Sequence, residues 1–262
     1  MILSLFFLIC FGSCLLGAIC GIGGGMIIKP ALDAIGILDV AAISFLSGCT
    51  VLAMTVYSVW RSRKSGTSQI NQQIGLPLAI GGVIGGIGGK QMFSVLAAAS
   101  GNLNQVGLIQ SASLVIITIG TLLYTVYKEK IPSFQFQNQL LCLTIGGFLG
   151  MVSSFLGIGG GPINLVVLFF FFSMPTKQAA ENSLYIILFS QIASLCTSVL
   201  TRSIPDFPWP ILLVMVTSGI IGGIAGRSIN RKISDKTVDR LFMFLMLIMI
   251  AMNGYNVVQF MS

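Results

Sequence analysis

The chain contains no histidine, and only 8% of its 262 residues are charged. A soluble domain carries about 25% charged residues, so this chain cannot cover a surface that faces water on all sides. The missing histidines, together with the lack of a Cys-x-x-Cys pair, argue against a zinc or haem site. The apolar segments also lack paired carboxylates, which argues against an enzyme. We therefore expect no catalytic residue, no metal and no cofactor.

Motifs for nucleotide chemistry are missing as well. Met26 and Pro162 stand where a G-x-G-x-x-G loop needs its last glycine, and no Lys-Ser/Thr pair follows either stretch. Without an ATPase motif, primary pumping by this chain alone is excluded. No basic segment precedes the first apolar stretch, so we expect that stretch to belong to the mature fold rather than to a signal peptide.

Long uncharged runs dominate what is present. They cover 1–28, 40–60, 65–89, 91–127, 131–176, 182–201, 207–226 and 241–262. A spanning helix needs about 20 mostly apolar residues, and runs such as LFMFLMLIMIAM do not alternate as barrel strands do. We predict an all-α, multi-pass protein of the cell (inner or plasma) membrane. The net charge of +7 lies mainly in short loops, as membrane orientation requires, and does not indicate nucleic-acid binding.

The sequence repeats itself once. Residues 17–32 resemble 153–168 at an offset of 136, and 85–90 (GGIGGK) correspond to 222–227 (GGIAGR) at an offset of 137. VAAISFL at 40–46 matches QAAENSL at 178–184 at an offset of 138. We therefore predict two repeats, 1–130 and 131–262, that form one membrane domain.

The first apolar segment of each repeat, near 2–36 and 138–173, is too long for one span and is interrupted by the sequence GIGGG. The short piece after each interruption could cross the membrane, giving four spans per repeat, or fold back as a hairpin beside three spans. Loop charges favour the hairpin. The loop 61–74 carries three basic residues and its counterpart 201–207 carries one, whereas 98–104 carries none and 227–240 carries five. Equivalent loops then face opposite sides of the membrane, so the repeats are inverted, each a broken re-entrant hairpin plus three transmembrane helices.

The two GIGGG stretches, at 21–25 and 157–161, are the candidate site. A glycine inside a helix costs about 1 kcal/mol relative to alanine, so two separate runs of three adjacent glycines in apolar surroundings suggest a purpose. In inverted repeats both breaks can meet near the midplane, where free main-chain N–H groups and helix N-termini bind anions. Glycines that only allow close helix packing are the alternative, and we prefer that alternative for 81–89.

Several features of these stretches resemble the TauE/SafE sulfite exporter family. They are the duplicated G-x-G-G-G break, the small polar start of the following helix, and the glycine-rich third helix that ends in Lys90 or Arg227. The resemblance implies a carrier of sulfite, sulfonates or other small anions. Members commonly have a Thr-Ser pair where this chain has ISF at 43–45 and ENS at 181–183; Phe45 departs from that pattern.

We therefore expect a small anion to bind at the breaks and at the polar helix starts. The candidate binding residues are Gly23, Gly24, Gly25, Met26, Gly159, Gly160, Gly161, Asn164, Ser44, Asn182, Ser183 and Gln191. For gating or coupling the candidates are Lys29, which could attract anions at the mouth of the site, and Glu181, Lys90 and Arg227.

Taken together, these features predict a secondary transporter, an exporter of a small organic or inorganic anion, that works by alternating access around the midplane site. A passive anion channel and a membrane assembly factor without transport activity are the alternatives. The expected partners are the anionic substrate, the lipid bilayer and, as an open option, a second copy of the chain in a homodimer.

Overall fold

The computed structural model describes residues 2–66, 68–100, 103–158 and 160–261, and within these ranges every regular element is a helix. The helices are α1 (Ile2–Cys20), α2 (Gly25–Ile35), α3 (Val40–Lys64), α4 (Gln72–Ser100), α5 (Leu103–Tyr127), α6 (Gln139–Leu156), α7 (Pro162–Phe172), α8 (Thr176–Leu200), α9 (Trp209–Asn230) and α10 (Asp235–Met261). In this part of the chain, eight helices are long and apolar enough to cross a membrane, while α2 and α7 have 11 residues each. The prediction of an all-α integral membrane protein is confirmed.

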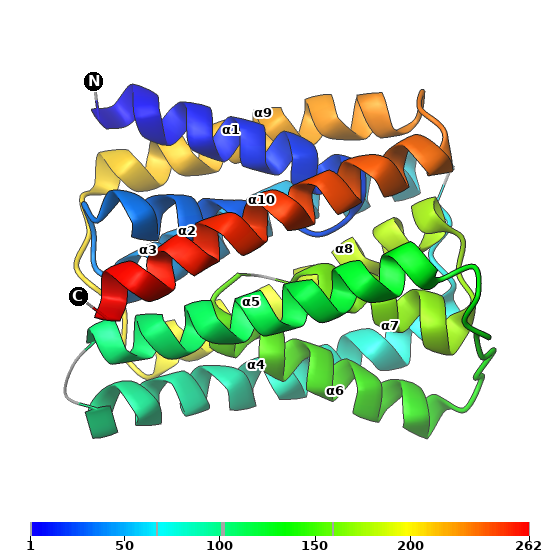
Figure 1. Cartoon of the computed structure of the whole chain (residues 1–262), viewed down its shortest axis with the longest axis horizontal. Coiled ribbons are helices and arrows are strands. Elements are labelled where there is room, and N and C mark those ends of the chain that lie inside the picture. Colours follow the sequence, from blue (N-terminus) through cyan, green and yellow to red (C-terminus); the bar gives the residue numbers. More distant parts are fainter. Residues whose placement is uncertain (1, 67, 101–102, 159, 262) are drawn as a thin grey trace.

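The helices run between two ends of a bundle (Figure 1). One end, which we call the terminal end, holds both chain termini and the connections 36–39 and 201–208. The other, which we call the basic end, holds the connections 65–71, 128–138, 173–175 and 231–234. The basic residues in or next to those four connections are Arg61, Arg63, Lys64, Lys128, Lys130, Lys177, Arg227, Arg231, Lys232, Lys236 and Arg240. Cytoplasmic loops are rich in such residues, so the basic end is the expected cytoplasmic face.

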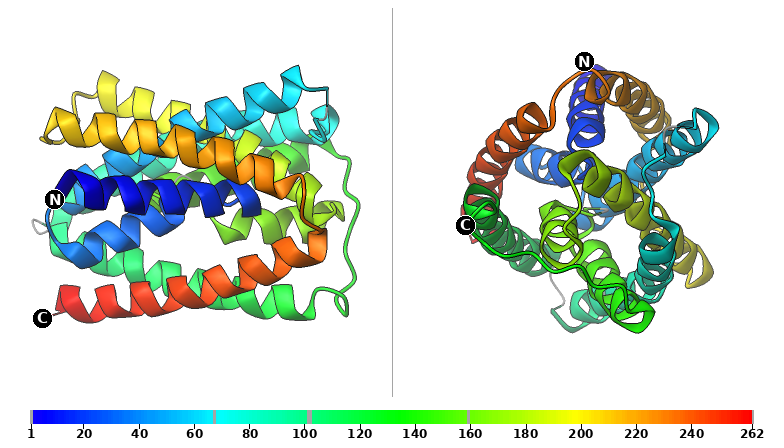
Figure 2. Two further views of the ribbon diagram at one scale, coloured as in Figure 1. Left: turned by 90° about the horizontal axis from the view of Figure 1, so that it is seen from above. Right: turned by 90° about the vertical axis from the view of Figure 1, so that its right-hand side faces the viewer.

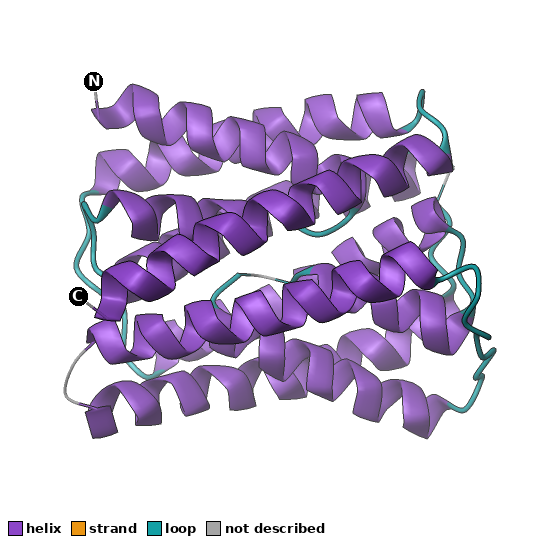
Figure 3. Cartoon of the chain, in the orientation of Figure 1, coloured by secondary structure: helices purple, strands orange, loops and turns teal. Residues whose placement is uncertain are grey.

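Two helical hairpins enter the bundle from opposite ends (Figure 1). α1 starts at the terminal end, stops inside the bundle and is followed by α2, which returns to the same end. α6 starts at the basic end, also stops inside, and α7 returns there. The chain between the arms of each hairpin lies within the bundle, as Figure 3 shows for its described residues. Both interrupted segments are therefore hairpins, while the two-fold relation between 1–130 and 131–262 stays a prediction.

Glycines fasten each hairpin to the other half of the chain. In α4, Gly85 faces the backbone of Gly147 in α6, and Gly89 faces Met151. In α9, Gly222 faces the backbone of Phe11 and Leu15 in α1. A side chain at these glycines would overlap main-chain atoms, so glycine is what allows the helices to touch. Figure 2 shows α1 beside α9 and α4 beside α6 when the bundle is viewed along its helices.

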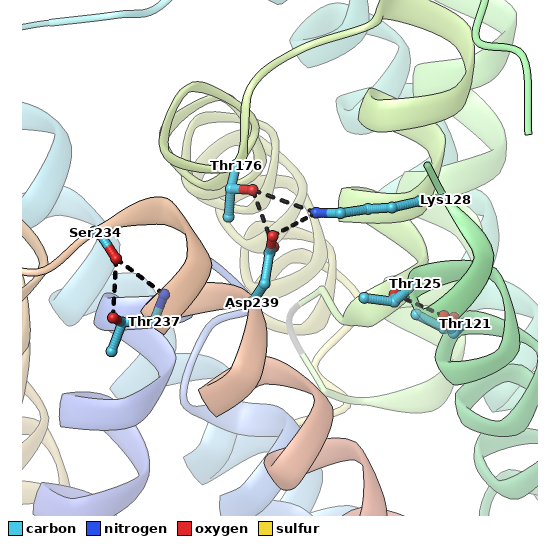
Figure 4. Close-up of polar contacts among 7 residues, drawn as sticks. All are labelled: Thr121, Thr125, Lys128, Thr176, Ser234, Thr237 and Asp239. Atoms are coloured by element: carbon cyan, nitrogen blue, oxygen red, sulfur yellow. Dashed lines mark hydrogen bonds and ion pairs between the residues drawn. The ribbon is translucent and has the colours of Figure 1, made fainter. Parts of the chain in front are cut away.

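A polar cluster ties three helices together at the basic end (Figure 4). The Lys128 ammonium, just after α5, lies 2.6 Å from the Asp239 carboxylate on α10. The Thr176 hydroxyl, in the first turn of α8, donates to the other Asp239 oxygen at 2.9 Å. Lys128 also lies over the Phe169 ring of α7, 4.7 Å from its centroid. This cluster joins the last helix of the first half to three helices of the second.

Candidate functional site

The two helix breaks touch each other inside the bundle. Gly25, the last residue of the first GIGGG, packs against the main chain of Ile158 in the second: a methyl group built on Gly25 would lie 2.9 Å from the Ile158 carbonyl carbon and closer still to its oxygen. Gly157 in turn packs against Ser44 on α3, where a methyl group would lie 2.6 Å from the hydroxyl oxygen. The tertiary structure thus brings together segments that are more than 130 residues apart in the sequence.

Glycine is required where the first arm of each hairpin ends. Gly21 follows α1 with a φ of 76°, and Gly157 follows α6 with a φ of 66°. The two positions are related by the same offset of 136 as the surrounding sequences. In this left-handed region a residue with a Cβ is strained, and glycine is the usual helix C-cap. The two first arms therefore end in the same way, whereas the returning helices begin differently: the N-cap Gly24 has a φ of −67° and the N-cap Gly161 a φ of 163°.

The returning helices point uncapped N-termini into this region. Gly24 and Gly161 occupy the N-cap positions of α2 and α7, and, being glycines, they supply no capping side chain to the first N–H groups of these helices. The N–H groups of a helix's first turn have no intrahelical partner, and the positive end of the helix dipole favours negative charge there. Pro162 begins α7, where its missing N–H is no loss.

Buried polar atoms without partners lie around the breaks. Among the described residues, the Ser47 and Ser183 hydroxyls and the Asn164 side-chain oxygen are buried and make no hydrogen bond. The Ser47 hydroxyl lies 2.9 Å from a methyl group built on Gly25, and the Asn164 amide nitrogen lies 3.5 Å from one built on Gly160. Buried polar groups are nearly always paired, so an unpaired group calls for an explanation such as a ligand or a water.

The structure gathers some predicted residues at the breaks and places others elsewhere. Gly23, Gly24, Gly160 and Gly161 are all buried there, whereas Gly159 lies outside the described residues. Met26 is fully buried in the hydrophobic core, where its side chain packs with apolar neighbours.

Asn182 lies away from the breaks, on the side of α8 that meets the connection 65–71. Its amide donates to the carbonyls of Gln178 at 2.8 Å and Gln69 at 3.3 Å. Its sequence counterpart Ser44, by contrast, lies against the second break at Gly157.

A cavity of about 210 Å³ lies between the first break and the basic end. Its rim includes the exposed Gln69 and Arg231, and its buried floor includes Ala180, which packs against Gly21 of the break. The remaining lining residues are Ala18, Ser58, Lys177, Glu181, Leu184, Arg227 and Asn230. The full lining contains three bases, Lys177, Arg227 and Arg231, and one acid, Glu181, so the cavity has a net positive charge.

A second, much smaller cavity of about 20 Å³ lies beside the second break. Its lining residues are Ser44, Phe45, Gly48, Lys90, Phe93, Ser154, Gly157, Gln191, Ser194, Leu195 and Ser198. None of these residues is exposed, although Ser44, Lys90, Gly157 and Leu195 are half-buried, so this cavity is narrower than the large one. This volume suits about one water molecule, and the serine hydroxyls and Gln191 make the space polar enough to hold one.

The two cavities use equivalent positions of the two halves. Lys90 and Arg227 differ by the repeat offset of 137, and so do Phe93 of the small cavity and Asn230 of the large one. Predicted gating residues therefore line both cavities. The same structural position borders a large cavity in one half and a very small one in the other.

Arg227 is available to an anion. Its guanidinium donates to the Ser58 carbonyl at 2.9 Å, but its buried Nε has no partner in the structure as described. The ion pairs found in the described ranges are Lys29–Asp33 and Lys128–Asp239, so no carboxylate neutralises Arg227 directly. A guanidinium with a free N–H in a partly closed cavity binds carboxylates, sulfonates and similar oxyanions well.

The structure corrects the prediction made for Lys29. Its ammonium lies 2.7 Å from the Asp33 carboxylate one turn further along α2, and both side chains are almost fully buried. The expectation that Lys29 attracts anions at the mouth of the site is wrong, because its charge is already matched and has no access to solvent.

Sequence reasoning missed Asn230, Arg231, Ser58 and Lys177, all of which line the large cavity. Asn230 and Arg231 follow Arg227 by three and four residues, so they share its helix face. That spacing could have identified them. Ser58 and Lys177 come from other helices, and no local pattern connects them to Arg227.

Comparison with known proteins gives a family match over nearly the whole chain. The family model described as "Sulfite exporter TauE/SafE" matches residues 5–252. The chain is similar to "Probable membrane transporter protein MJ0441" of Methanocaldococcus jannaschii, with 28% identity over 259 residues, 90% of this chain and 89% of the relative.

The match to a second relative is partial. "Probable membrane transporter protein YunE" of Bacillus subtilis is 27% identical over 116 residues, which cover 44% of this chain and 40% of that relative. No solved structure matches the chain.

Proposed function

The chain belongs to the sulfite exporter TauE/SafE family and is a multi-pass membrane transporter rather than an enzyme; from this premise we propose that it is a secondary transporter that exports a small anion such as sulfite or a sulfonate. In this proposal the anion binds between the two helix breaks and reaches them alternately from the two membrane faces. The observation that carries the proposal is the pair of equivalent cavities, one of about 210 Å³ and one of about 20 Å³, on either side of the touching breaks.

The chemistry of the breaks supports an anion as the substrate. The N-termini of α2 and α7 offer main-chain donors, and the Ser47 hydroxyl, which has no partner among the described residues, adds a donor nearby. Arg227 and Arg231 line the approach from the basic end. Main-chain donors in a region of low dielectric stabilise a negative charge without placing a buried base at the site itself.

The unequal cavities support alternating access. The route from the basic end reaches Ala180, next to the first break, while the equivalent cavity around Lys90 and Phe93 is only about 20 Å³. With the basic end in the cytoplasm, this conformation faces the cytoplasm. Rocking of one half against the other would close the Arg227 cavity and open the Lys90 cavity.

Transport by the purified protein in proteoliposomes tests the proposal. We expect saturable uptake of labelled sulfite or a sulfonate, and exchange of external label against internal unlabelled anion. Arg227→Ala and Lys90→Ala should each lower the rate by about tenfold or more, because each removes a charge from one access route. Arg240→Ala, which removes an exposed base outside both cavities, should leave the rate unchanged.

Two results would overturn parts of this proposal. Flux that rises linearly with anion concentration and shows no exchange would identify a passive channel. Absence of flux for every sulfur oxyanion and carboxylate tested, in protein that is folded and inserted, would reject small-anion transport.

A further inference from the structure

Glu181 is the one acid that lines the large cavity, and its carboxylate is bonded to two neighbouring segments. It lies on α8, half-buried, and accepts hydrogen bonds from the Ser62 hydroxyl of α3 and from the Gln69 main-chain N–H at 2.9 Å. These bonds link three segments around the cavity: α3, α8 and the connection 65–71. Glu181 forms no ion pair within the described ranges, although bases line the same cavity.

Each neighbouring helix contributes a charged or titratable group near this carboxylate. α9 contributes Arg227 and Arg231, which line the cavity, and α8 itself contributes Lys177 one turn before Glu181. α3 contributes Arg61, which shares a further surface hollow with Arg227.

Two tyrosines and one more arginine complete the set. Tyr57 of α3 lines the same hollow as Arg61. Tyr185, one turn after Glu181 on α8, packs under the Arg63 guanidinium at 5.2 Å. The described part of the connection 65–71 contributes no charge.

We infer that Glu181 takes up a proton when an anion enters this cavity, so that proton and anion bind together. The inference rests on the proposed function and adds a proton, bound by Glu181, as a second species that binds with the anion. An anion held by Arg227 shares a cavity of only about 210 Å³ with the Glu181 carboxylate, and like charges at such separations repel. Protonation of Glu181 removes this repulsion and keeps the cavity net positive.

The equivalent position in the other half supports a role specific to one face. The offset of 138 that relates 40–46 to 178–184 places Ile43 opposite Glu181. Ile43 is almost fully buried, and every group that lines the small cavity is a base, a polar group or an apolar group. Proton binding would therefore be linked to the anion when the cavity at the basic end is open.

Methanesulfonate is a suitable probe because its own charge does not change between mildly acidic and mildly alkaline pH. We expect wild-type protein to bind it about 5- to 150-fold more tightly at mildly acidic pH than at mildly alkaline pH, the usual size of coupling between two sites. Binding at neutral pH in weak buffer should remove protons from solution, as a pH-indicator dye can report. In Glu181→Gln, which keeps the shape but cannot ionise, the affinity should be independent of pH and no proton should be taken up.

Glu129→Gln is the matched control, because it removes an exposed acid at the same end of the bundle but outside the cavity. It should retain the wild-type pH dependence. A wild-type affinity that is independent of pH, or a Glu181→Gln variant that keeps the wild-type pH dependence, would overturn the inference while leaving anion transport intact. Because proton uptake is measured on the wild-type protein, it tests the inference even if the Glu181→Gln protein does not fold. If the wild-type protein neither binds nor transports methanesulfonate or sulfite, the proposed function fails, and the inference fails with it.

Discussion

Replacement of Gly25 by alanine tests whether the two helix breaks touch. The added methyl group would lie 2.9 Å from the Ile158 carbonyl carbon and 2.9 Å from the Ser47 hydroxyl oxygen, and closer still to the Ile158 oxygen. Carbon atoms in good contact are about 3.5–4.0 Å apart, so the two breaks would have to separate by at least about half an ångström. Because a main-chain carbonyl cannot rotate away as a side chain can, the strain falls on the breaks themselves.

Overpacking of this kind costs about 1–3 kcal/mol of unfolding free energy. For a chain of this size, 1 kcal/mol corresponds to a drop of about 2–4 °C in melting temperature. We therefore expect Gly25→Ala to melt several degrees below wild type when the detergent-solubilised protein is heated and its monodisperse fraction is measured by size-exclusion chromatography. Its anion transport should fall as well, since the breaks line the proposed site.

Gly161→Ala is the matched control at the equivalent position of the second break. A methyl group there would meet only the end of the Ile158 side chain, at 3.1 Å, and the extended φ of 163° suits any residue. Its melting temperature should stay within about 2 °C of wild type. A Gly25→Ala protein as stable as Gly161→Ala would refute the close contact between the breaks.

The remaining predictions concern the buried ion pair and the sidedness of the bundle. Asp33→Asn should lower the unfolding free energy by about 3–5 kcal/mol, because it leaves the buried Lys29 ammonium uncompensated, and the double variant Lys29→Met/Asp33→Leu should be less destabilised than Asp33→Asn. A double variant destabilised as much as Asp33→Asn or more would mean that an uncompensated ammonium is not the cause of the loss. In a cysteine-free background, Ser68→Cys in the connection 65–71 should react with an impermeant maleimide only from the cytoplasm, and Ile204→Cys in 201–208 only from outside. Labelling of both from one side would contradict the opposite placement of these connections.

Much of the fold could be predicted because its causes are local. The shortage of charge and the length of each apolar run set the helices, and a run of about 35 residues with three adjacent glycines had to break where it does. α1, α2, α6 and α7 accordingly begin and end close to the predicted breaks. The loop charges also favoured hairpins over extra spans, as the bundle shows.

The sequence also shows two opposite charges at a spacing that brings them together on one helix. Lys29 and Asp33 are four residues apart, the spacing at which helical side chains meet, and yet Lys29 was assigned to the site. Its burial depends on α2 lying among other helices, in contact with α1, α3 and α10. The family resemblance predicts that Asn182 lies at the site, whereas its side chain bonds to Gln69.

By itself the sequence determined the membrane setting, the helices, the duplicated breaks and the matched positions of Lys90 and Arg227, because these depend on composition, spacing and repetition along the chain. Only the tertiary structure decided that Gly25 lies against Ile158, that Glu181 shares a cavity with Arg227, and that the Lys90 cavity is much smaller than its counterpart. The physical reason is that nearly identical local sequences can take unequal surroundings. Which of two equivalent cavities is the larger depends on how helices from both halves pack around them. That packing is a balance of many weak, long-range contacts.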